Sequence, residues 1–299
     1  MIDVHSLRVF VSVAEKLSVT GAGEALGLTQ SAVSHQVAKL ERELKADLLE
    51  RHGRTIRVTP AGLELVRAGR EVIQRIDALA GVVRTAADPN QGRLRVGATV
   101  TACQYLLPDP IRELRECFPG YALNIRPGDS AEVCRGIETG ELDLGIVIGG
   151  KHVGKLPTQP LFRDELGLVC HPSHRFASLP KISAADLVGQ QWVMYAQQSA
   201  TFDLVERHLA TLRVRIERPI ELGSVEAIKE LVKVGLGISA LAKWATKADI
   251  EQGSLLWQPL PGRKLQREWL IVLPADRQPS LAEQCVVELC RTAGRNLVG

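Results

Sequence analysis

The chain has 299 residues, of which 45% are hydrophobic and 24% charged, with a formal net charge of +3. This length exceeds the usual size of one compact core, so two or more domains are expected. Because the net charge is mild, any affinity for DNA must come from local placement of charge and from oligomerisation. No apolar stretch reaches the roughly eighteen residues of a membrane span, and MIDVHSLRVF lacks an export signal, so a cytoplasmic protein with no membrane partner is expected.

The six cysteines are scattered, and no pair has the two-residue spacing typical of a zinc site or a redox dithiol. Buried reduced thiols are therefore expected, and no metal or cofactor is predicted. Two histidines flank Pro172 and could touch a metal, but a surface turn is the commoner explanation. The residues concerned are Cys103, Cys117, Cys134, Cys170, Cys285 and Cys290, with His171 and His174.

Three short helices are predicted at the N-terminus. Apolar residues at three- and four-residue intervals predict an amphipathic helix from about Val4 to Leu17. Ser18 can cap a second helix, which Gly27 ends because glycine tolerates a left-handed conformation. The residues expected to face inward are Leu7, Phe10, Ala14 and Leu17 in the first helix and Ala22, Ala25 and Leu26 in the second.

A third helix, capped by Thr29, is predicted to have an apolar inner face and a short polar outer face. The inner residues are Val33, Val37, Leu40 and Leu44. Small polar groups near a helix N-terminus suit the major groove of DNA, where they can reach phosphates and base edges. For any one of these residues alone an ordinary solvated face is as good an explanation. The candidate DNA-binding residues of this helix are Thr29, Gln30, Ser31, Ser34, His35 and Lys39.

The segment RHGRTIRVT that follows is predicted to form a small hairpin wing. Its alternation places Ile56 and Val58 inward, and Thr55, Arg57 and Thr59 outward. Three arginines without an intervening acid suit phosphates or a narrow minor groove. A solvated basic loop is the alternative if the preceding helices are absent. The candidate DNA-binding residues here are Arg51, Arg54 and Arg57.

The segments EALGLTQSAVSHQVAKLERELKADLLER and RVTPAG, with the preceding helix, resemble the LysR-type transcriptional regulators over Leu7 to Gly62. By this resemblance, Gln30, Ser31, Ser34, His35 and Lys39 fall on the family's recognition helix and Arg54 on its wing. The chain departs from the family pattern at Gly21, Gly23 and Leu49. Each glycine is expected to loosen the second helix by about 1 kcal/mol relative to alanine.

Thr59 followed by Pro60 predicts the start of a long helix that runs to about Ala87. Its broad apolar stripe calls for a partner helix, and a DNA reader gains affinity by presenting two copies to two half-sites. Dimerisation through this helix is therefore expected, although such a stripe can also pack on its own domain. The resemblance further implies a homotetramer that bends DNA. The stripe comprises Val66, Gly69, Ile73, Ile76, Ala80 and Val83, beside Leu65, Val72 and Leu79.

Residues 88–92 form a breaker cluster that predicts a hinge, after which strands and helices alternate in an α/β pattern. Two lobes joined by crossing strands are expected, with a cleft that closes on small molecules as in periplasmic binding proteins, which the effector domains of the LysR family resemble. Short buried strands are predicted over 94–98, 122–126, 144–148, 167–170, 191–195, 215–221, 237–241 and 269–273, the last returning to the first lobe. Helices are predicted over 106–117, 132–139, 202–212 and 225–234.

The expected organisation is therefore an all-α N-terminal part followed by an α/β part. We assign 1–59 to a winged helix-turn-helix domain, 60–88 to a linker and dimerisation helix, and 89–299 to an effector-binding domain. Lobe I of this domain would comprise about 92–163 and 268–299, and lobe II about 164–267.

Hydroxyl groups gather at the predicted strand-to-helix junctions, and helix N-termini beside them attract anions. These positions also match where the resembling family builds its effector pocket. A carboxylate or an inorganic oxyanion is the favoured effector, because hydroxyls and backbone amides suit it without a fixed cation. The alternative is that each serine or threonine only caps its helix. The candidate effector-binding residues are Thr99, Thr101, Gln104, Ser130, Gly149, Ser199, Thr201 and Ser224.

These features predict a transcriptional regulator that binds double-stranded DNA and whose cleft ligand shifts the population of assembly geometries. A thiol-based redox sensor that uses Cys103 is one alternative, and a cytoplasmic solute-binding protein is another. An enzyme is disfavoured, because no nucleophile elbow, phosphate loop or paired cleft carboxylates stand out. Glu138, Glu141 and Asp143 cluster where solvation is expected to explain them.

Overall fold

The computed structural model describes residues 2–52, 55–87 and 91–298. The chain divides into two compact units, residues 1–89 and 90–299. No helix in the described ranges is long and apolar enough to cross a membrane.

Unit 1 begins with three helices that start and end at capping residues. Asp3, Ser18 and Thr29 cap their N-termini by accepting backbone N–H groups, as such side chains commonly do. Gly27 ends the second helix with φ of +67°, the left-handed conformation that glycine adopts without strain. The elements are α1 (Val4–Lys16), α2 (Val19–Leu26), α3 (Gln30–Leu44), β1 (Leu49–His52), β2 (Thr55–Val58) and α4 (Pro60–Ala87).

The core of unit 1 lies among these three helices, and the first one is buried on more than one side. Phe10 is fully buried as predicted, and so are Val9 and Val13, which the stripe did not include. The prediction was wrong for Leu17, which is the left-handed C-cap of α1 and is 55% exposed. It was also wrong for Ala25 and Leu26, because the short α2 buries only its Ala22 and Gly23.

The two glycines of α2 have different environments. A Cβ atom on Gly23 would lie 2.7 Å from the carbonyl oxygen of Leu28, whereas one on Gly21 would meet nothing closer than 3.4 Å. Leu28 also donates its N–H to the Gly23 carbonyl. Glycine at position 23 therefore allows the chain to turn closely against the helix. The expected loosening of α2 by glycine applies only to Gly21.

The wing is an antiparallel hairpin in which Leu49 pairs with Val58 and His52 with Thr55. Ile56 and Val58 pack against the helical core as predicted. The prediction was wrong for Thr59, which is buried because its hydroxyl donates to the carbonyl of Asp47 and accepts from the N–H of Gly62. This threonine fixes the start of α4 against the segment before the wing.

The first turns of α4 pack on the same small core. Leu65, Val66 and Ile73 are partly buried against it, and a Cβ atom on Gly69 would lie 2.8 Å from Leu7. Part of the predicted dimerisation stripe therefore packs within its own unit, which was the alternative considered for it. The side chains of Leu79, Ala80 and Val83 lie outside the described residues.

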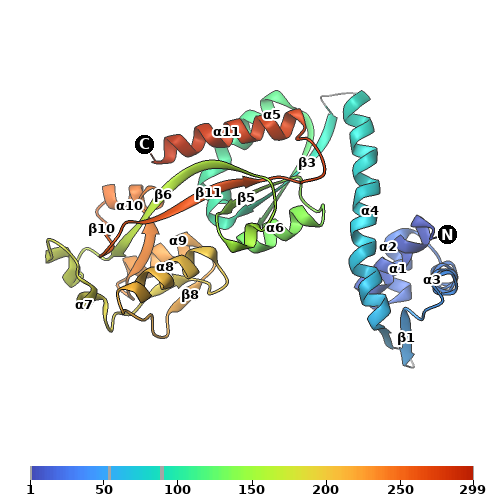
Figure 1. Cartoon of the computed structure of the whole chain (residues 1–299), viewed down its shortest axis with the longest axis horizontal. Helices are drawn as coiled ribbons and strands as arrows, with labels where there is room; N and C mark the ends of the chain where they lie inside the picture. The colour runs from blue at the N-terminus through green and yellow to red at the C-terminus, as the bar shows by residue number, and fades with distance from the viewer. Residues whose placement is uncertain (1, 53–54, 88–90, 299) are drawn as a thin grey trace. The chain divides into compact units, whose positions relative to one another are not determined.

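Lobe I of unit 2 is built on parallel strands, with β3 between β4 and β5. Figure 1 shows α5 and α11 on one face of this sheet and α6 on the other. The strand at 122–126 is present but is not buried as predicted, because it forms the edge of the sheet. The elements are β3 (Gln91–Thr99), the π-helix η1 (Ala102–Leu106), α5 (Pro108–Cys117), β4 (Gly120–Gly128), α6 (Ser130–Glu138), β5 (Leu144–Ile148), η2 (Lys151–Val153) and α11 (Leu281–Val298).

Lobe II packs its helices around buried Trp192, Val193 and Ile238. The predicted strand at 215–221 is wrong for most of its length, because Arg218 has φ of +46° and Pro219 follows it, so only β8 forms. The elements are η3 (Arg175–Ser178), α7 (Ala184–Leu187), β7 (Val193–Tyr195), α8 (Ala200–Thr211), β8 (Ile220–Leu222), α9 (Val225–Lys233), β9 (Ser239–Ala242), η4 (Trp244–Thr246), α10 (Lys247–Glu251) and β10 (Leu256–Pro259).

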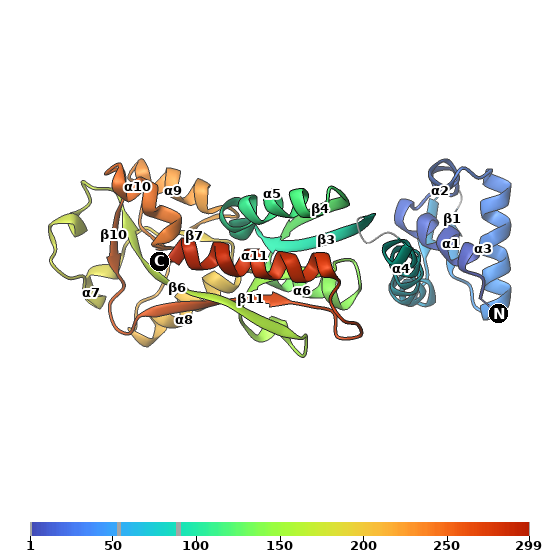
Figure 2. The same ribbon diagram turned by 90° about the horizontal axis from the view of Figure 1, so that it is seen from above.

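Two long antiparallel strands, β6 (Thr158–Cys170) and β11 (Leu265–Val272), run through both lobes. β11 pairs with β5 in lobe I, which confirms the predicted return of the chain, and β6 pairs with β9 and β10 in lobe II. Figure 2 shows both strands passing from one lobe to the other beside α11. Any relative motion of the lobes must therefore bend or twist this pair of strands.

Candidate DNA interface and effector site

The N-terminal part of α3 presents polar side chains to solvent. Gln30, Ser31 and His35 are exposed, and Ser34 is half-buried. The hydroxyl of Thr29 accepts the N–H of Ala32 at 3.2 Å and lies 3.1 Å from that of Ser31. All the predicted DNA-binding residues of this helix except Lys39 therefore lie around one exposed helix start, where backbone N–H groups attract phosphate.

Lys39 lies two turns further along α3 and has a partner inside the unit. Its ammonium group is 3.6 Å from the carboxylate of Asp3, and both side chains are about two-fifths exposed. In the same region the hydroxyl of Ser6 donates to the amide oxygen of Gln36 at 2.7 Å. These two contacts fix the orientation of α3 on α1, so the exposed residues are held on a rigid support.

The predicted basic residues of the wing are only partly described. Arg57 lies on β2 and is exposed. Arg51 pairs with Ile56 in the hairpin register, but its side chain lies outside the described residues, as does the whole of Arg54. The carboxylate of Glu41 accepts the N–H groups of Leu48 and Leu49, which attaches the base of the wing to α3.

Three predicted effector residues of lobe I lie at the ends of its parallel strands. Thr99 ends β3, and its hydroxyl accepts the N–H of Ala102 at 3.3 Å. Ser130 is not the cap of α6, because Asp129 fills that position; the Ser130 hydroxyl accepts the N–H of Ile148 at 3.2 Å. Gly149 follows β5 directly. The three are therefore brought to the same edge of the sheet, where open α/β sheets bind their ligands.

Ser199 and Thr201 lie at the start of α8 in lobe II. Ser199 is the cap of this helix and accepts the N–H of Phe202 at 3.1 Å. Thr201 is only 2% exposed, and its hydroxyl accepts a hydrogen bond of 2.9 Å from the guanidinium of Arg267 on β11. The start of α8 is thus attached to a crossing strand through a side chain that the sequence did not single out.

Gln104 and Ser224 form a direct contact between the lobes. The amide of Gln104 on η1 donates to the hydroxyl of Ser224 at 3.4 Å, and Ser224 caps nothing in α9. Thr101, the residue before η1, is buried and likewise makes no side-chain cap. The hydroxyls of Thr101 and Ser224 are therefore not accounted for by helix capping, which was the alternative considered for these positions.

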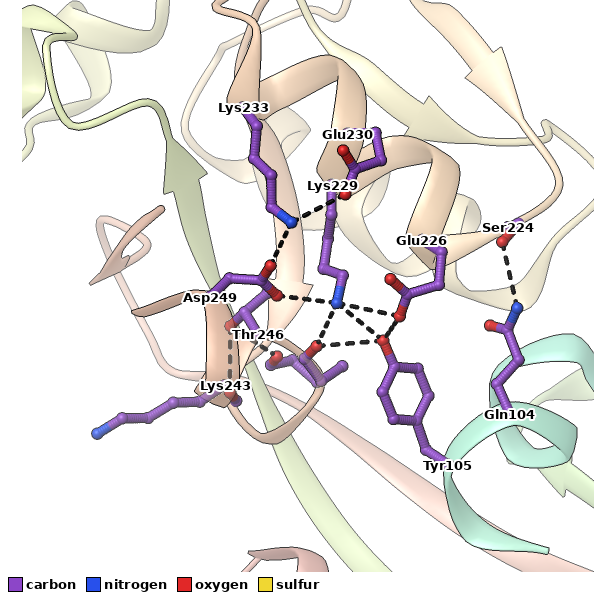
Figure 3. Close-up of polar contacts among 12 residues, drawn as sticks. Gln104, Tyr105, Ser224, Glu226, Lys229, Glu230, Lys233, Lys243, Thr246 and Asp249 are labelled. Atoms are coloured by element: carbon purple, nitrogen blue, oxygen red, sulfur yellow. Dashed lines mark hydrogen bonds and ion pairs between the residues drawn. The ribbon is translucent and has the colours of Figure 1, made fainter. Parts of the chain in front are cut away.

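Beside this contact, Tyr105 of lobe I reaches into a charged cluster of lobe II, which Figure 3 shows. Its hydroxyl contacts the carboxylate of Glu226 and the ammonium group of Lys229, the latter at 3.1 Å. Lys229 also lies 2.8 Å from Asp249, which in turn lies 2.5 Å from Lys233. Tyr105 thus connects η1 of lobe I to this cluster of lobe II.

The charges of the cluster stabilise one another. Burial opposes ionisation of Asp249, but its hydrogen bonds and ion pairs with Lys229 and Lys233 outweigh this and hold its pKa below the ordinary 3.8. Burial likewise opposes the charge of Lys229, yet hydrogen bonds to Asp249 and Glu226 raise its pKa above 10.5. Asp249 and Lys229 therefore stay ionised at neutral pH.

The cysteines offer little support for a thiolate chemistry. Burial raises the pKa of Cys103, and its thiol lies 3.8 Å from the carbonyl of Ala98 as a hydrogen-bond donor. Burial also raises the pKa of Cys134 and Cys170 to about 11 each and that of Cys290 to about 12. Reactive cysteines have a lowered pKa, so these four differ from that class.

The other candidate groups are held by local contacts. His171 lies 2.6 Å from the hydroxyl of Ser173, and His174 accepts the N–H of Phe176 in the same loop. In the acidic cluster, Asp143 is not simply solvated as expected, because Arg95 donates to both of its carboxylate oxygens. Within the described ranges no three histidine, cysteine or acidic side chains gather as a metal site would require.

Two residues that the sequence analysis missed join the parts of unit 2. Arg267 and Asp164 form an ion pair in which the side chains are 1% and 0% exposed, and Trp244 donates its indole N–H to the same carboxylate at 2.9 Å. The sequence shows only a charge near the start of each apolar strand. Their pairing depends on the register of β6 and β11, which sequence patterns do not reveal.

A winged helix-turn-helix with an exposed polar helix start, followed by a long helix and a two-lobed α/β module, defines a DNA-binding regulator with a ligand-binding domain. The particular family follows from sequence comparison. The chain belongs to the LysR family: residues 4–63 match the bacterial regulatory helix-turn-helix protein, lysR family, and residues 87–295 match the LysR substrate binding domain. It is therefore a LysR-type DNA-binding transcriptional regulator.

Curated relatives match along most of their length. A probable RuBisCO transcriptional regulator of Nostoc sp. (strain PCC 7120) is 31% identical over 94% of this chain and 85% of its own. The HTH-type transcriptional regulator CbbR of Rhodospirillum rubrum is 28% identical over 98% of this chain and 97% of its own. Among solved structures, full-length CbnR complexed with its target DNA has a TM-score of 0.70 at 21% identity, covering 98% of this chain and all of that one.

Proposed function

We propose that this regulator reads a specific double-stranded DNA site through the start of α3 and the β1–β2 wing, and that a small anionic effector held between its two lobes controls this binding. The observation that supports the DNA part is the set of exposed polar residues Gln30, Ser31 and His35 on a rigidly packed helix. CbnR, a protein of the same fold, has been solved in complex with its target DNA, which agrees with this proposal.

DNA sites selected from a random library with the full-length protein test this part. His35→Ala is expected to weaken binding to the selected site by about tenfold, in the range of one lost base contact. Arg112→Ala removes a cation from an exposed ion pair of unit 2 and is the matched control. Equal loss in both variants, or no loss in His35→Ala, contradicts the proposed role of α3.

We infer that two copies associate through α4, so that two readers meet two half-sites, and that dimers assemble further into a homotetramer. Val72 of the predicted stripe is 45% exposed and Ile76, four residues further along the same face, is half-buried, although Leu65, Val66 and Ile73 pack inside the unit. Val72→Glu with Ile76→Glu is expected to lower the mass seen by analytical ultracentrifugation. Arg67→Glu, at a side chain that is 82% exposed, should leave it unchanged, and an unchanged mass in both variants contradicts the inference.

The effector part is supported by Thr99, Ser130 and Gly149 at one edge of the lobe I sheet. The start of α8 lies beside lobe I, because Ala200 packs against the lobe I core, and Gln104 and Ser224 contact each other between the lobes. Hydroxyls and helix N-termini suit a carboxylate or an oxyanion. A thermal-shift screen of small metabolite anions on the full-length protein should identify ligands that raise the melting temperature. Thr101→Val and Ser224→Ala should abolish the shift, and a shift unaffected by both contradicts the assigned site.

A further inference from the structure

A hollow of about 550 Å³ lies where lobe II meets the crossing strands and the end of α11. Its walls come from three parts of unit 2: Arg163 and Glu165 on β6, Trp244 and Lys247 near α10, and Leu297 on α11. Figure 2 shows these elements meeting near the C-terminus. None of the predicted effector residues lines it, so it is distinct from the proposed effector site.

The lining of this hollow combines charged residues with five aromatic or aliphatic ones. Trp244 and Trp257 contribute indole rings, and Ile250, Leu297 and Val298 contribute aliphatic surface. Both indole N–H groups are already satisfied, by Asp164 at 2.9 Å and by the carbonyl of Leu241 at 3.1 Å. The tryptophans therefore offer only apolar surface to a ligand, and the volume is that of ordinary small-molecule sites.

The charges around the hollow are unequally compensated. Asp164 is paired with Arg267, Glu165 with Lys264, and Arg163 with Glu268. Lys243 lies over the ring of Trp257 at 5.6 Å. Lys247 and Glu251 are exposed and form no ion pair with other residues of the described ranges. Among the residues that the structure describes, two lysines and one glutamate of the hollow thus have no ion-pair partner, which favours a ligand with a single negative charge.

We propose that this hollow is a second ligand site, and that it takes an amphipathic monocarboxylate whose apolar body lies between the tryptophans and whose carboxylate lies near Lys247. A purely polar oxyanion would leave the aromatic walls without a partner, and a neutral apolar ligand would leave the two lysines unused. The occupant is therefore chemically different from the small anion proposed for the cleft.

A ligand here would act on the effector site through one buried chain of contacts. Trp244 contacts Asp164, Asp164 pairs with Arg267, and Arg267 donates to Thr201 at the start of α8. This step rests on the proposed function, because it requires that Thr201 belongs to the effector site. Coupling of two sites is reciprocal, so each ligand should change the affinity for the other by the same factor.

Titration of the full-length protein with 3-phenylpropionate, followed by tryptophan fluorescence, tests the site. Trp192 and Trp269 are fully buried, so a saturable change is expected to come from Trp244 and Trp257 and to shrink in Trp257→Phe. A fragment of this size is expected to bind with Kd of about 1 mM. The neutral 3-phenylpropionamide is expected to bind more weakly, and equal binding overturns an anion site.

Substitutions at two exposed residues should change the affinity for 3-phenylpropionate in opposite directions. Lys247→Gln should weaken binding by about two- to fivefold, and Glu251→Gln should strengthen it by a similar factor, as for exposed ion pairs. Lys181→Gln, at an exposed lysine that does not line the hollow, is the matched control. The proposed site is overturned if Lys247→Gln and Lys181→Gln bind 3-phenylpropionate equally well. It is also overturned if the fluorescence shows no saturable change up to about 5 mM 3-phenylpropionate.

The coupling has its own readout. Trp244→Phe removes the indole N–H that contacts Asp164 but keeps an aromatic ring at the hollow. It should abolish any effect of 3-phenylpropionate on the affinity for the anion that the thermal-shift screen identifies, while fluorescence from Trp257 still reports binding to the hollow. An effect that persists in Trp244→Phe overturns the coupling through this chain. Binding to the hollow that is unaffected by Thr101→Val separates this site from the proposed effector site.

Discussion

Arg267 and Asp164 lie directly opposite each other on the two strands that join the lobes, and they form a fully buried ion pair. The guanidinium donates to one carboxylate oxygen at 3.0 Å and to the other at 2.5 Å. Burial opposes the charge of Arg267, but Asp164 holds the pKa of its guanidinium above the usual range. This pair fixes the point at which β6 and β11 pass between the lobes.

Arg267→Leu is expected to destabilise the protein by about 3–5 kcal/mol, because it leaves Asp164 charged and buried without its main partner. Arg163→Leu removes an arginine whose side chain is 69% exposed and whose partner is Glu268, so it should cost less than about 1 kcal/mol. Urea unfolding followed by circular dichroism measures both. Similar free energies of unfolding for the two variants would show that the buried pair is not special.

Gly21→Ala and Gly23→Ala should change stability in opposite directions. The Gly21 variant is expected to gain about 0.5–1 kcal/mol, because alanine is the better helix former and its Cβ meets no close neighbour. The Gly23 variant should lose stability, because its Cβ would contact the Leu28 carbonyl at 2.7 Å. Thermal unfolding of the full chain compares them, and stabilisation by Gly23→Ala would contradict the close approach of the chain to α2.

The Asp249 cluster should make stability depend on pH at both ends of the range. The pKa of Asp249 is lowered, so its contribution is present above 3.8 and is lost as the pH falls through the folded value. The pKa of Lys229 is raised, so its contribution is present below 10.5 and is lost as the pH rises through the folded value. The melting temperatures of wild type and Asp249→Asn should differ most between these limits.

At neutral pH, Asp249→Asn is expected to lower the free energy of unfolding by about 2–3 kcal/mol. This is less than the loss expected for breaking an isolated buried ion pair, because Lys229 and Lys233 keep their glutamate partners. Asp109→Asn, at an exposed carboxylate paired with Arg112, is the control and should follow wild type at every pH. A constant difference between wild type and Asp249→Asn down to about pH 2, well below the unperturbed carboxyl pKa, would contradict the assignment.

Cys103 should react slowly with iodoacetamide near pH 8, because burial raises its pKa and little thiolate is present. Cys117 is exposed and should be modified first. Mass spectrometry of peptides after timed alkylation measures the order. Modification of Cys103 before Cys117, together with loss of DNA binding on mild oxidation, would support the redox-sensing alternative.

The helices of the winged helix-turn-helix domain could be predicted because their caps and apolar spacing are local signals. Ser18 and Thr29 cap their helices as predicted, and the strand over 144–148 was predicted with its observed bounds. The burial of Thr59 could not be predicted, because it depends on a hydrogen bond to Asp47 across the wing. Alternation along a strand gives the face of a residue but not its tertiary partner.

The candidate effector site was predicted only as a set of strand-to-helix junctions. Sequence position identified Ser130 and Thr201, but the structure was needed to show that their hydroxyls bond to Ile148 and Arg267. No sequence pattern indicated the cluster around Lys229, since its partner Tyr105 lies 124 residues away from Lys229 in the chain. Contacts between lobes depend on the fold as a whole, which local patterns do not encode.

The most direct test of DNA reading by the start of α3 compares Gln30→Ala with Arg57→Ala across selected and unrelated DNA at several salt concentrations. Gln30→Ala should lose about 1–3 kcal/mol of preference for the selected site at an unchanged salt slope. Arg57→Ala should weaken binding to all sequences and reduce that slope by about 1. If Gln30→Ala kept the full wild-type preference for the selected site over unrelated DNA, DNA reading by the start of α3 would be contradicted.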